Sequence, residues 1–167
     1  LRKMLEEFAD PSVFVVTSEP SHMINSRPMP AFNSGRRLGF ELLVSPVGRK
    51  ASTGVEKDLF LIAADSGENE NLNRETVYLD WVRERMERGS ACTVTKIEMS
   101  GFRLVRTTRQ TQKKNGKRIR PNLRRPHVLV AGQLMIYQPD AFNLLLSQGV
   151  GRHRSFGYGM LLLKPVS

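Results

Sequence analysis

The sequence contains a single cysteine, Cys92, and no long hydrophobic run. One cysteine cannot form an internal disulfide, which excludes the disulfide-stabilised class of small secreted domains. The longest apolar stretches, residues 59–64 and 160–163, are far shorter than the roughly 18 to 20 residues that span a bilayer. No secretory signal opens the chain, so we expect a soluble protein of the cytoplasm.

Length and composition are those of a folded domain. The chain has 167 residues, enough for one full domain or two small ones that share a core. Hydrophobic residues make up 40% and charged residues 25%, with both signs mixed, which argues against a disordered chain. The first residue is Leu1 and not a methionine, so we expect that part of a longer N-terminus precedes it.

Carboxylates are absent between Met99 and Pro139, and this stretch carries the whole excess of positive charge. Without its ten cations the chain has sixteen basic and sixteen acidic residues. Most of the ten are arginines, which suit bidentate contacts with phosphate. A solvated basic surface is the simpler alternative, but a focused field of this kind favours a nucleic-acid partner. We call these residues the cationic block: Arg103, Arg106, Arg109, Lys113, Lys114, Lys117, Arg118, Arg120, Arg124 and Arg125.

Hydrophobic patterning predicts the following elements. Strands are expected at residues 12–18, 38–47, 92–108, 127–137 and 158–165, and helices at residues 74–88 and 140–148. Asn73 is a suitable cap for the first helix and Gly89 a suitable stop. Asn115 and Gly116 predict a hairpin turn inside the cationic block. Residues 58–64 fit no element clearly.

From Leu38 onward the predicted order is strand, helix, strand, strand, helix, strand. This order is typical of an α+β ferredoxin-like (RRM-like) domain, in which two helices cover one face of a four-stranded antiparallel sheet. We therefore expect a ferredoxin-like domain over residues 36–167. Residues 1–35 have room for only a strand or two and are expected to be the C-terminal part of a first, incomplete ferredoxin-like domain.

The connection before the last strand, residues 149–159, contains four glycines and three potentially basic side chains. We call it the glycine-rich loop. Its glycines allow a close approach to a phosphate or ribose. It follows a helix and opens a strand, so it is neither the dinucleotide-binding fingerprint nor a P-loop. Arg152, His153 and Arg154 at its tip favour binding over a simple tight turn.

The C-terminal segment GVGRHRSFGYGMLLLKP, preceded by the helix DAFNLLLSQ, closely resembles the C-terminus of the CasE-type CRISPR RNA endoribonucleases. More loosely, LGFELLVSPV, ETVYLDWV and the cationic block match the first strand, the first helix and the hairpin of the second domain in that family. The resemblance covers most of residues 36–167. It implies two tandem ferredoxin-like domains.

The resemblance also implies a function. Such proteins bind the stem-loop of a CRISPR repeat, cut precursor CRISPR RNA at the 3′ base of the stem without metal, and remain bound as a subunit of the Cascade surveillance complex. The products are a 2′,3′-cyclic phosphate and a 5′-hydroxyl, and no cofactor is expected. The RNA-binding residues would be the cationic block together with Gly149, Gly151, Arg152, His153, Arg154, Ser155, Gly157 and Gly159.

Metal-independent cleavage needs a histidine that titrates near neutral pH, supported by fixed cations. The resemblance implies that the catalytic histidine lies upstream of Leu1. Within this chain His153 is the weak catalytic candidate, and His22 and His127 are weaker still. A metal site is not expected, because the histidines are scattered. Two alternatives stay open: a non-catalytic RNA-binding module and a purely structural subunit of a ribonucleoprotein complex.

Overall fold

The computed structural model describes residues 29–49, 54–67, 71–108 and 122–166. Residues from Phe32 onward form one compact unit. The strand predicted at residues 12–18 and the turn at Asn115 and Gly116 lie outside the described residues. The expected first domain, residues 1–35, lies almost wholly outside them as well and stays a prediction.

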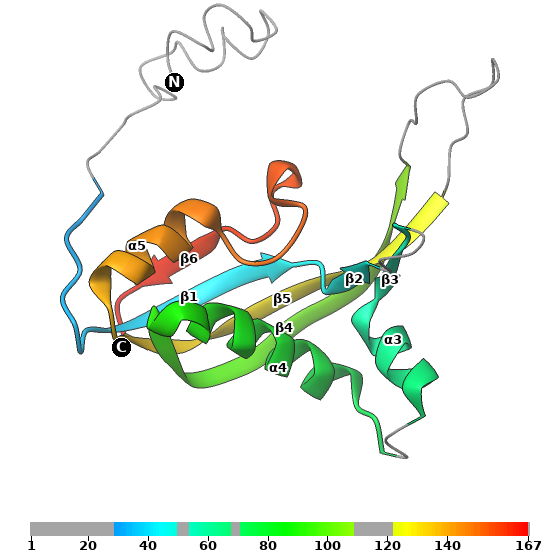
Figure 1. Ribbon diagram of the computed structural model, residues 1–167, viewed down its shortest axis with the longest axis horizontal. Helices are drawn as coiled ribbons and strands as arrows, with labels where there is room; N and C mark the ends of the chain where they lie inside the picture. Colours follow the sequence, from blue (N-terminus) through cyan, green and yellow to red (C-terminus); the bar gives the residue numbers. More distant parts are fainter. Residues whose placement is uncertain (1–28, 50–53, 68–70, 109–121, 167) are drawn as a thin grey trace, which may run out of the picture. The chain divides into compact units, whose positions relative to one another are not determined.

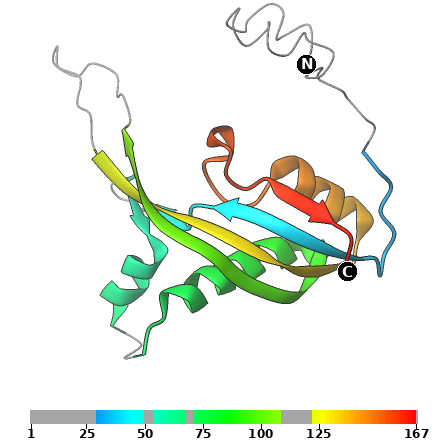
Figure 2. The same cartoon turned by 180° about the vertical axis from the view of Figure 1, so that it is seen from behind.

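The centre of the unit is a four-stranded antiparallel sheet (Figures 1 and 2). Its strands are β1 (Arg37–Val44), β4 (Cys92–Thr108), β5 (Asn122–Ile136) and β6 (Leu161–Lys164), in the order β4-β5-β1-β6. In the register of the sheet, Phe40 of β1 lies between Gly132 of β5 and Leu163 of β6. This order, with the first strand in the middle next to the last, is that of a ferredoxin-like domain, and the predicted fold is confirmed.

Two helices, α4 (Arg74–Glu87) and α5 (Pro139–Gln148), cover one face of the sheet, as Figure 1 shows. The Asn73 side chain caps α4 by accepting a hydrogen bond from the Glu75 amide at 2.8 Å, as predicted. Helix and strand side chains form one core, whose largest fully buried members are Phe40, Leu42, Val44, Tyr78, Val82, Met86, Val128, Val130, Leu134, Ile136, Phe142 and Val150.

Cys92 belongs to this core, at 3% exposure, with its sulfur 3.4 Å from the Met86 carbonyl oxygen. Burial raises the pKa of the Cys92 thiol to about 12. A thiol with this pKa is unreactive at neutral pH, so Cys92 serves as a small core residue.

An insertion between β1 and α4 holds the segments that the sequence left open. It comprises β2 (Val47–Arg49), β3 (Glu56–Asp58) and the short helix α3 (Leu59–Ser66). Asp58 explains why a helix begins there: its carboxylate is 2.9 Å from the Phe60 amide and 2.7 Å from both the Tyr78 hydroxyl and the Arg74 guanidinium. This buried carboxylate therefore ties the insertion to α4.

Several predicted boundaries shift. The strand expected at residues 38–47 splits into β1 and β2 around Pro46, which lacks an amide hydrogen for the ladder. The strand β5 begins at Asn122 instead of residue 127, because it stays paired with β4 along a long two-stranded ribbon. The last strand is only Leu161–Lys164, since Tyr158 and Gly159 belong to the loop before it. No helix within the described residues is long and apolar enough to cross a membrane.

Candidate RNA-binding site

The glycine-rich loop is anchored at both of its ends. The Val150 amide donates to the Gly159 carbonyl at 2.8 Å, and the Gly159 amide donates to the Leu43 carbonyl of β1 at 2.7 Å. Val150 itself is 2% exposed. The loop closes on itself against the sheet, and its tip, with Arg152 and Arg154, is exposed.

The glycines of this loop have different reasons to be glycine. Gly151 has φ +83°, and a Cβ atom there would lie 2.6 Å from Cη2 of Trp81. Packing against the core therefore explains Gly151, where the sequence had suggested close approach to RNA. Gly157 has φ +84°, but a Cβ atom there would meet no atom within 4 Å. At Gly157 the backbone is open to an incoming ligand.

The β4–β5 ribbon meets the loop through a row of polar side chains. Arg125 and His127 are two residues apart in β5 and project from the same face of the strand. Nε2 of His127 lies 3.2 Å from Nη2 of Arg103, and Nδ1 of His127 lies 3.2 Å from the Tyr158 hydroxyl. Arg103 of the cationic block is thus linked to the glycine-rich loop through His127.

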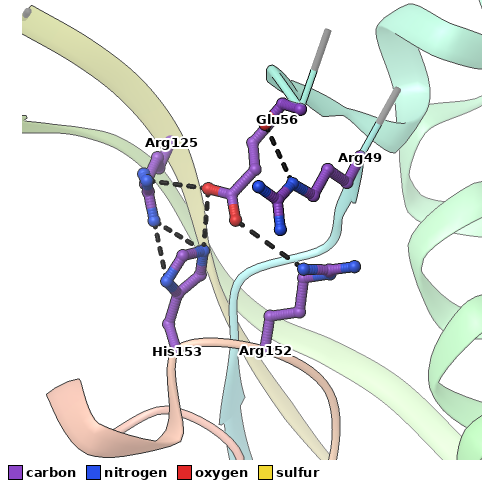
Figure 3. A network of polar contacts seen from close by, with 6 residues as sticks. Arg49, Glu56, Arg125, Arg152 and His153 are labelled. Carbon is purple, nitrogen blue, oxygen red and sulfur yellow. Dashed lines mark hydrogen bonds and ion pairs between the residues drawn. The ribbon is translucent and has the colours of Figure 1, made fainter. Parts of the chain in front are cut away.

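A carboxylate joins the two segments (Figure 3). Oε2 of Glu56, in β3, lies 2.7 Å from Nη2 of Arg125 and 3.2 Å from Nε2 of His153, and Oε1 lies 4.0 Å from Nη1 of Arg152. Nη1 of Arg125 also lies 2.8 Å from Nδ1 and 2.5 Å from Nε2 of His153. Arg49 closes the turn beside this cluster through a 3.0 Å bond from its Nε to the Gly54 carbonyl.

A cavity of about 660 Å³ opens beside the loop tip, and its walls carry Glu56, Arg85, Arg152, His153 and Arg154. The Arg85 guanidinium lies 5.0 Å from the centre of the Trp81 ring, and its buried Nε has no hydrogen-bond partner within the described residues. Burial and the charges of Arg88 and Arg152 lower the pKa of Arg85. The cavity is therefore a place where an anion would be stabilised.

The described histidines are engaged at both ring nitrogens. Burial and the charge of Arg125 lower the pKa of His153, against the opposing effect of Glu56. Burial and Arg103 lower the pKa of His127. Neither ring is free to take a proton from a substrate without breaking these contacts. His22 lies outside the described residues.

The structure brings part of the predicted site together. Arg103, Arg125 and residues 149–159 lie in the contacts given above, and Arg106 and Arg124 face each other in the ribbon register. Arg154 donates to the Gln148 carbonyl at the end of α5. The other six members of the cationic block lie outside the described residues: Arg109, Lys113, Lys114, Lys117, Arg118 and Arg120.

Three residues of this site were not predicted: Glu56, Arg85 and Tyr158. Glu56 sits in a polar stretch, and only the fold brings it to Arg125. Arg85 follows Trp81 by four residues in α4 and so lies on the same face of the helix. This spacing is typical of a core position and not of a binding site. The carboxylates Asp80 and Glu84 of α4 form ordinary surface ion pairs, Asp80 with Arg83 at 3.4 Å and Glu84 with Arg88 at 2.9 Å.

Comparison with known proteins identifies the family. A family model described as CRISPR associated protein matches residues 4–165. Among curated proteins no sequence matches. Solved structures of this kind are similar in fold to the chain. Thermus thermophilus Cse3, bound to an RNA representing a pre-cleavage complex, has a TM-score of 0.58 at 22% identity, covering 82% of this chain and 57% of its own.

The second is the CRISPR-associated protein Cas6e from Escherichia coli str. K-12, with a TM-score of 0.53 at 20% identity, covering 84% of this chain and 66% of its own. A chain of a CRISPR RNA-guided surveillance complex has a TM-score of 0.55 at 22% identity, covering 85% of this chain and 64% of its own. This chain spans less than two thirds of each of them. Since the family model matches nearly the whole sequence, the chain belongs to the family of CRISPR-associated proteins, as its resemblance to the CasE-type proteins predicted.

Proposed function

We propose that this chain binds the stem-loop of a CRISPR repeat RNA and belongs to an enzyme that processes precursor CRISPR RNA. The observation that carries the proposal is the convergence of cations on one polar cavity. Arg85 of α4 and Arg152 and Arg154 of the glycine-rich loop lie in its wall, and Arg125 of the ribbon pairs with Glu56 in the same wall. Family membership and the RNA-bound state of similar structures support RNA as the anion.

The shape of an RNA stem suits such a surface. An A-form helix has a deep, narrow major groove lined by phosphates, so a protein recognises it mainly through its backbone and shape. The β4–β5 ribbon could follow one strand of phosphates with Arg103 and Arg106, while the loop contacts the adjacent backbone at Gly157. The remaining cations of the block would extend this surface.

We further propose that cleavage is metal-independent and leaves a 2′,3′-cyclic phosphate and a 5′-hydroxyl. The ribose 2′-OH attacks the adjacent phosphorus, a base accepts the 2′-OH proton, and an acid protonates the departing 5′-oxygen. Guanidinium groups in the cavity, such as Arg152 and Arg154, would stabilise the charge that develops on the phosphorane.

A second candidate function is RNA binding without cleavage by this chain. It is favoured by the state of the two described histidines, whose ring nitrogens are all engaged and whose pKa values are lowered. In both cases we propose that the protein stays with its RNA as a subunit of the Cascade complex. Co-purification with other subunits of that complex tests this part.

The experiment is to incubate the 167-residue chain with a repeat RNA in excess chelator and to determine the ends of the products by mass. Cleavage at the 3′ base of the stem with a cyclic phosphate supports the enzyme. Tight binding to the hairpin without cleavage supports the second candidate. Absence of preferential binding to the hairpin contradicts both, and a 5′-phosphate product contradicts the proposed chemistry.

A further inference from the structure

Glu56 is the one carboxylate in the wall of the cationic cavity among the described residues. It contacts Arg125 of the ribbon and His153 and Arg152 of the loop. The side chains of Glu56, Arg125 and His153 are only 21%, 14% and 12% exposed. A partly buried carboxylate with close partners holds them more firmly than an exposed surface pair does.

The His153 ring lies between the carboxylate of Glu56 and the guanidinium of Arg125. Nη1 of Arg125 is 2.8 Å from Nδ1 and 2.5 Å from Nε2 of His153, so the guanidinium faces the edge of the ring. Oε2 of Glu56 lies 3.2 Å from the same Nε2. The groups facing this ring are Glu56, Arg125, the neighbouring Arg152 and the Tyr158 ring, whose centre is 6.4 Å away. The position of the ring is therefore fixed by groups from β3 and β5.

The backbone at His153 also needs such support. His153 has φ +63° and ψ +28°, in the left-handed region that residues with a Cβ atom avoid. It precedes the short helical turn η3 (Arg154–Phe156), which carries the side chains of Arg154 and Phe156. A strained residue persists only where its surroundings fix it. The Arg125 and Glu56 contacts are what fix the His153 side chain.

We propose that Glu56 is a positioning residue of the RNA-binding surface, which locks the glycine-rich loop to the β4–β5 ribbon through His153 and Arg125. The proposal rests on the proposed RNA-binding function and deepens it. In this arrangement Glu56 touches no RNA. It sets the direction of the Arg125 guanidinium and the shape of the loop tip, so that the cations of both segments meet one stretch of RNA backbone.

This role and simple electrostatics predict opposite results. Removing a carboxylate from a basic site strengthens the attraction for a polyanion if charge alone matters. Removing a positioning residue weakens binding, because the loop and Arg125 must then be ordered when the RNA binds. The sign of the change in affinity therefore decides between the two.

The test is the affinity of the chain for a repeat hairpin, measured by fluorescence anisotropy at fixed salt, for Glu56→Ala and the matched Glu84→Ala. Glu84 is an exposed carboxylate of α4 that pairs only with Arg88 among the described residues. We expect Glu56→Ala to weaken binding on the order of tenfold, the scale of one charge-assisted hydrogen bond. Glu84→Ala should bind as the wild type does or slightly more tightly. Unchanged or tighter binding by Glu56→Ala overturns the proposal.

Two further measurements keep the proposal independent of a folding defect and of the proposed function. Glu56→Gln keeps the size of the side chain, should fold normally, and should still bind more weakly than the wild type. In the RNA-free protein, backbone ¹⁵N relaxation should show the glycine-rich loop to be ordered in the wild type and more mobile in Glu56→Ala. Equal order of the loop in both proteins overturns the positioning role, whereas failure of the wild type to bind the hairpin overturns the proposed function.

Discussion

Gly151 and Gly157 offer a matched pair of substitutions in one loop. Both have a positive φ, of +83° and +84°, so alanine at either position meets a similar backbone cost of about 1–2 kcal/mol. They differ in space: a Cβ atom at Gly151 would lie 2.6 Å from the buried Trp81 ring, while at Gly157 it would meet nothing within 4 Å. Overpacking at Gly151 adds about 1–3 kcal/mol.

Gly151→Ala should therefore lower the free energy of unfolding by about 2–5 kcal/mol, and Gly157→Ala by only about 1–2 kcal/mol. Hairpin affinity should show the opposite order. Gly157→Ala should weaken RNA binding more than Gly151→Ala does, because the backbone at Gly157 is open and a new methyl group there obstructs a bound strand. The assays are urea unfolding followed by tryptophan fluorescence, which reports on Trp81, and hairpin affinity. Equal loss of stability in the two variants would refute the role assigned to Trp81, and wild-type affinity of Gly157→Ala would refute close approach of RNA there.

Three further predictions concern stability and charge. Asp58→Ala should lower the free energy of unfolding by about 2–4 kcal/mol, because it removes the α3 cap and leaves the Tyr78 hydroxyl without its buried acceptor. The control Asp80→Ala removes an exposed carboxylate and should change the free energy of unfolding little. Equal effects of the two substitutions would contradict the role of Asp58. The pKa values of His127 and His153 are lowered from 6.5, so the unfolded chain binds more protons below that pH, and stability should fall as pH drops through 6.5. Urea unfolding at pH 7.5 and 5.5 measures this, and equal or greater stability at pH 5.5 would contradict it. Hairpin affinity should fall with salt with a log–log slope on the order of −4 for about five phosphate contacts, and Arg103→Ala should reduce the slope by about one; an unchanged slope would place Arg103 outside the interface.

The fold was largely predictable because its elements depend on local patterns. The apolar stripe and the Asn73 cap predicted α4, and the alternation after Cys92 predicted β4. Helix α3 was not predictable in the same way: it is short, and the Asp58 cap that starts it is held by Arg74 and Tyr78, sixteen and twenty residues away. Its existence depends on tertiary contacts.

The site was predictable only in part, for the same reason. Charge excess and glycine spacing indicated the ribbon and the loop, since these features are continuous in the sequence. Glu56 carries no local signal, yet it is the partner of Arg125, 69 positions later in the chain. Arg85 shares a helical stripe with Trp81, and its guanidinium covers the outer side of that ring instead of joining the core. Spacing alone cannot distinguish these two positions.

The most direct test of the account compares two double variants that lose the same charge. Arg152→Gln with Arg154→Gln removes two cations from the cavity. Arg37→Gln with Arg83→Gln removes an exposed arginine of β1 and a half-exposed arginine of α4, neither of which lines the cavity. Hairpin affinity is measured at one salt concentration, with thermal unfolding as a check on the fold. We expect the cavity variant to bind at least about tenfold more weakly, because two phosphate contacts are lost, and the other variant to stay within about threefold of the wild type. Equal weakening of both would show that RNA binding follows net charge and not this site.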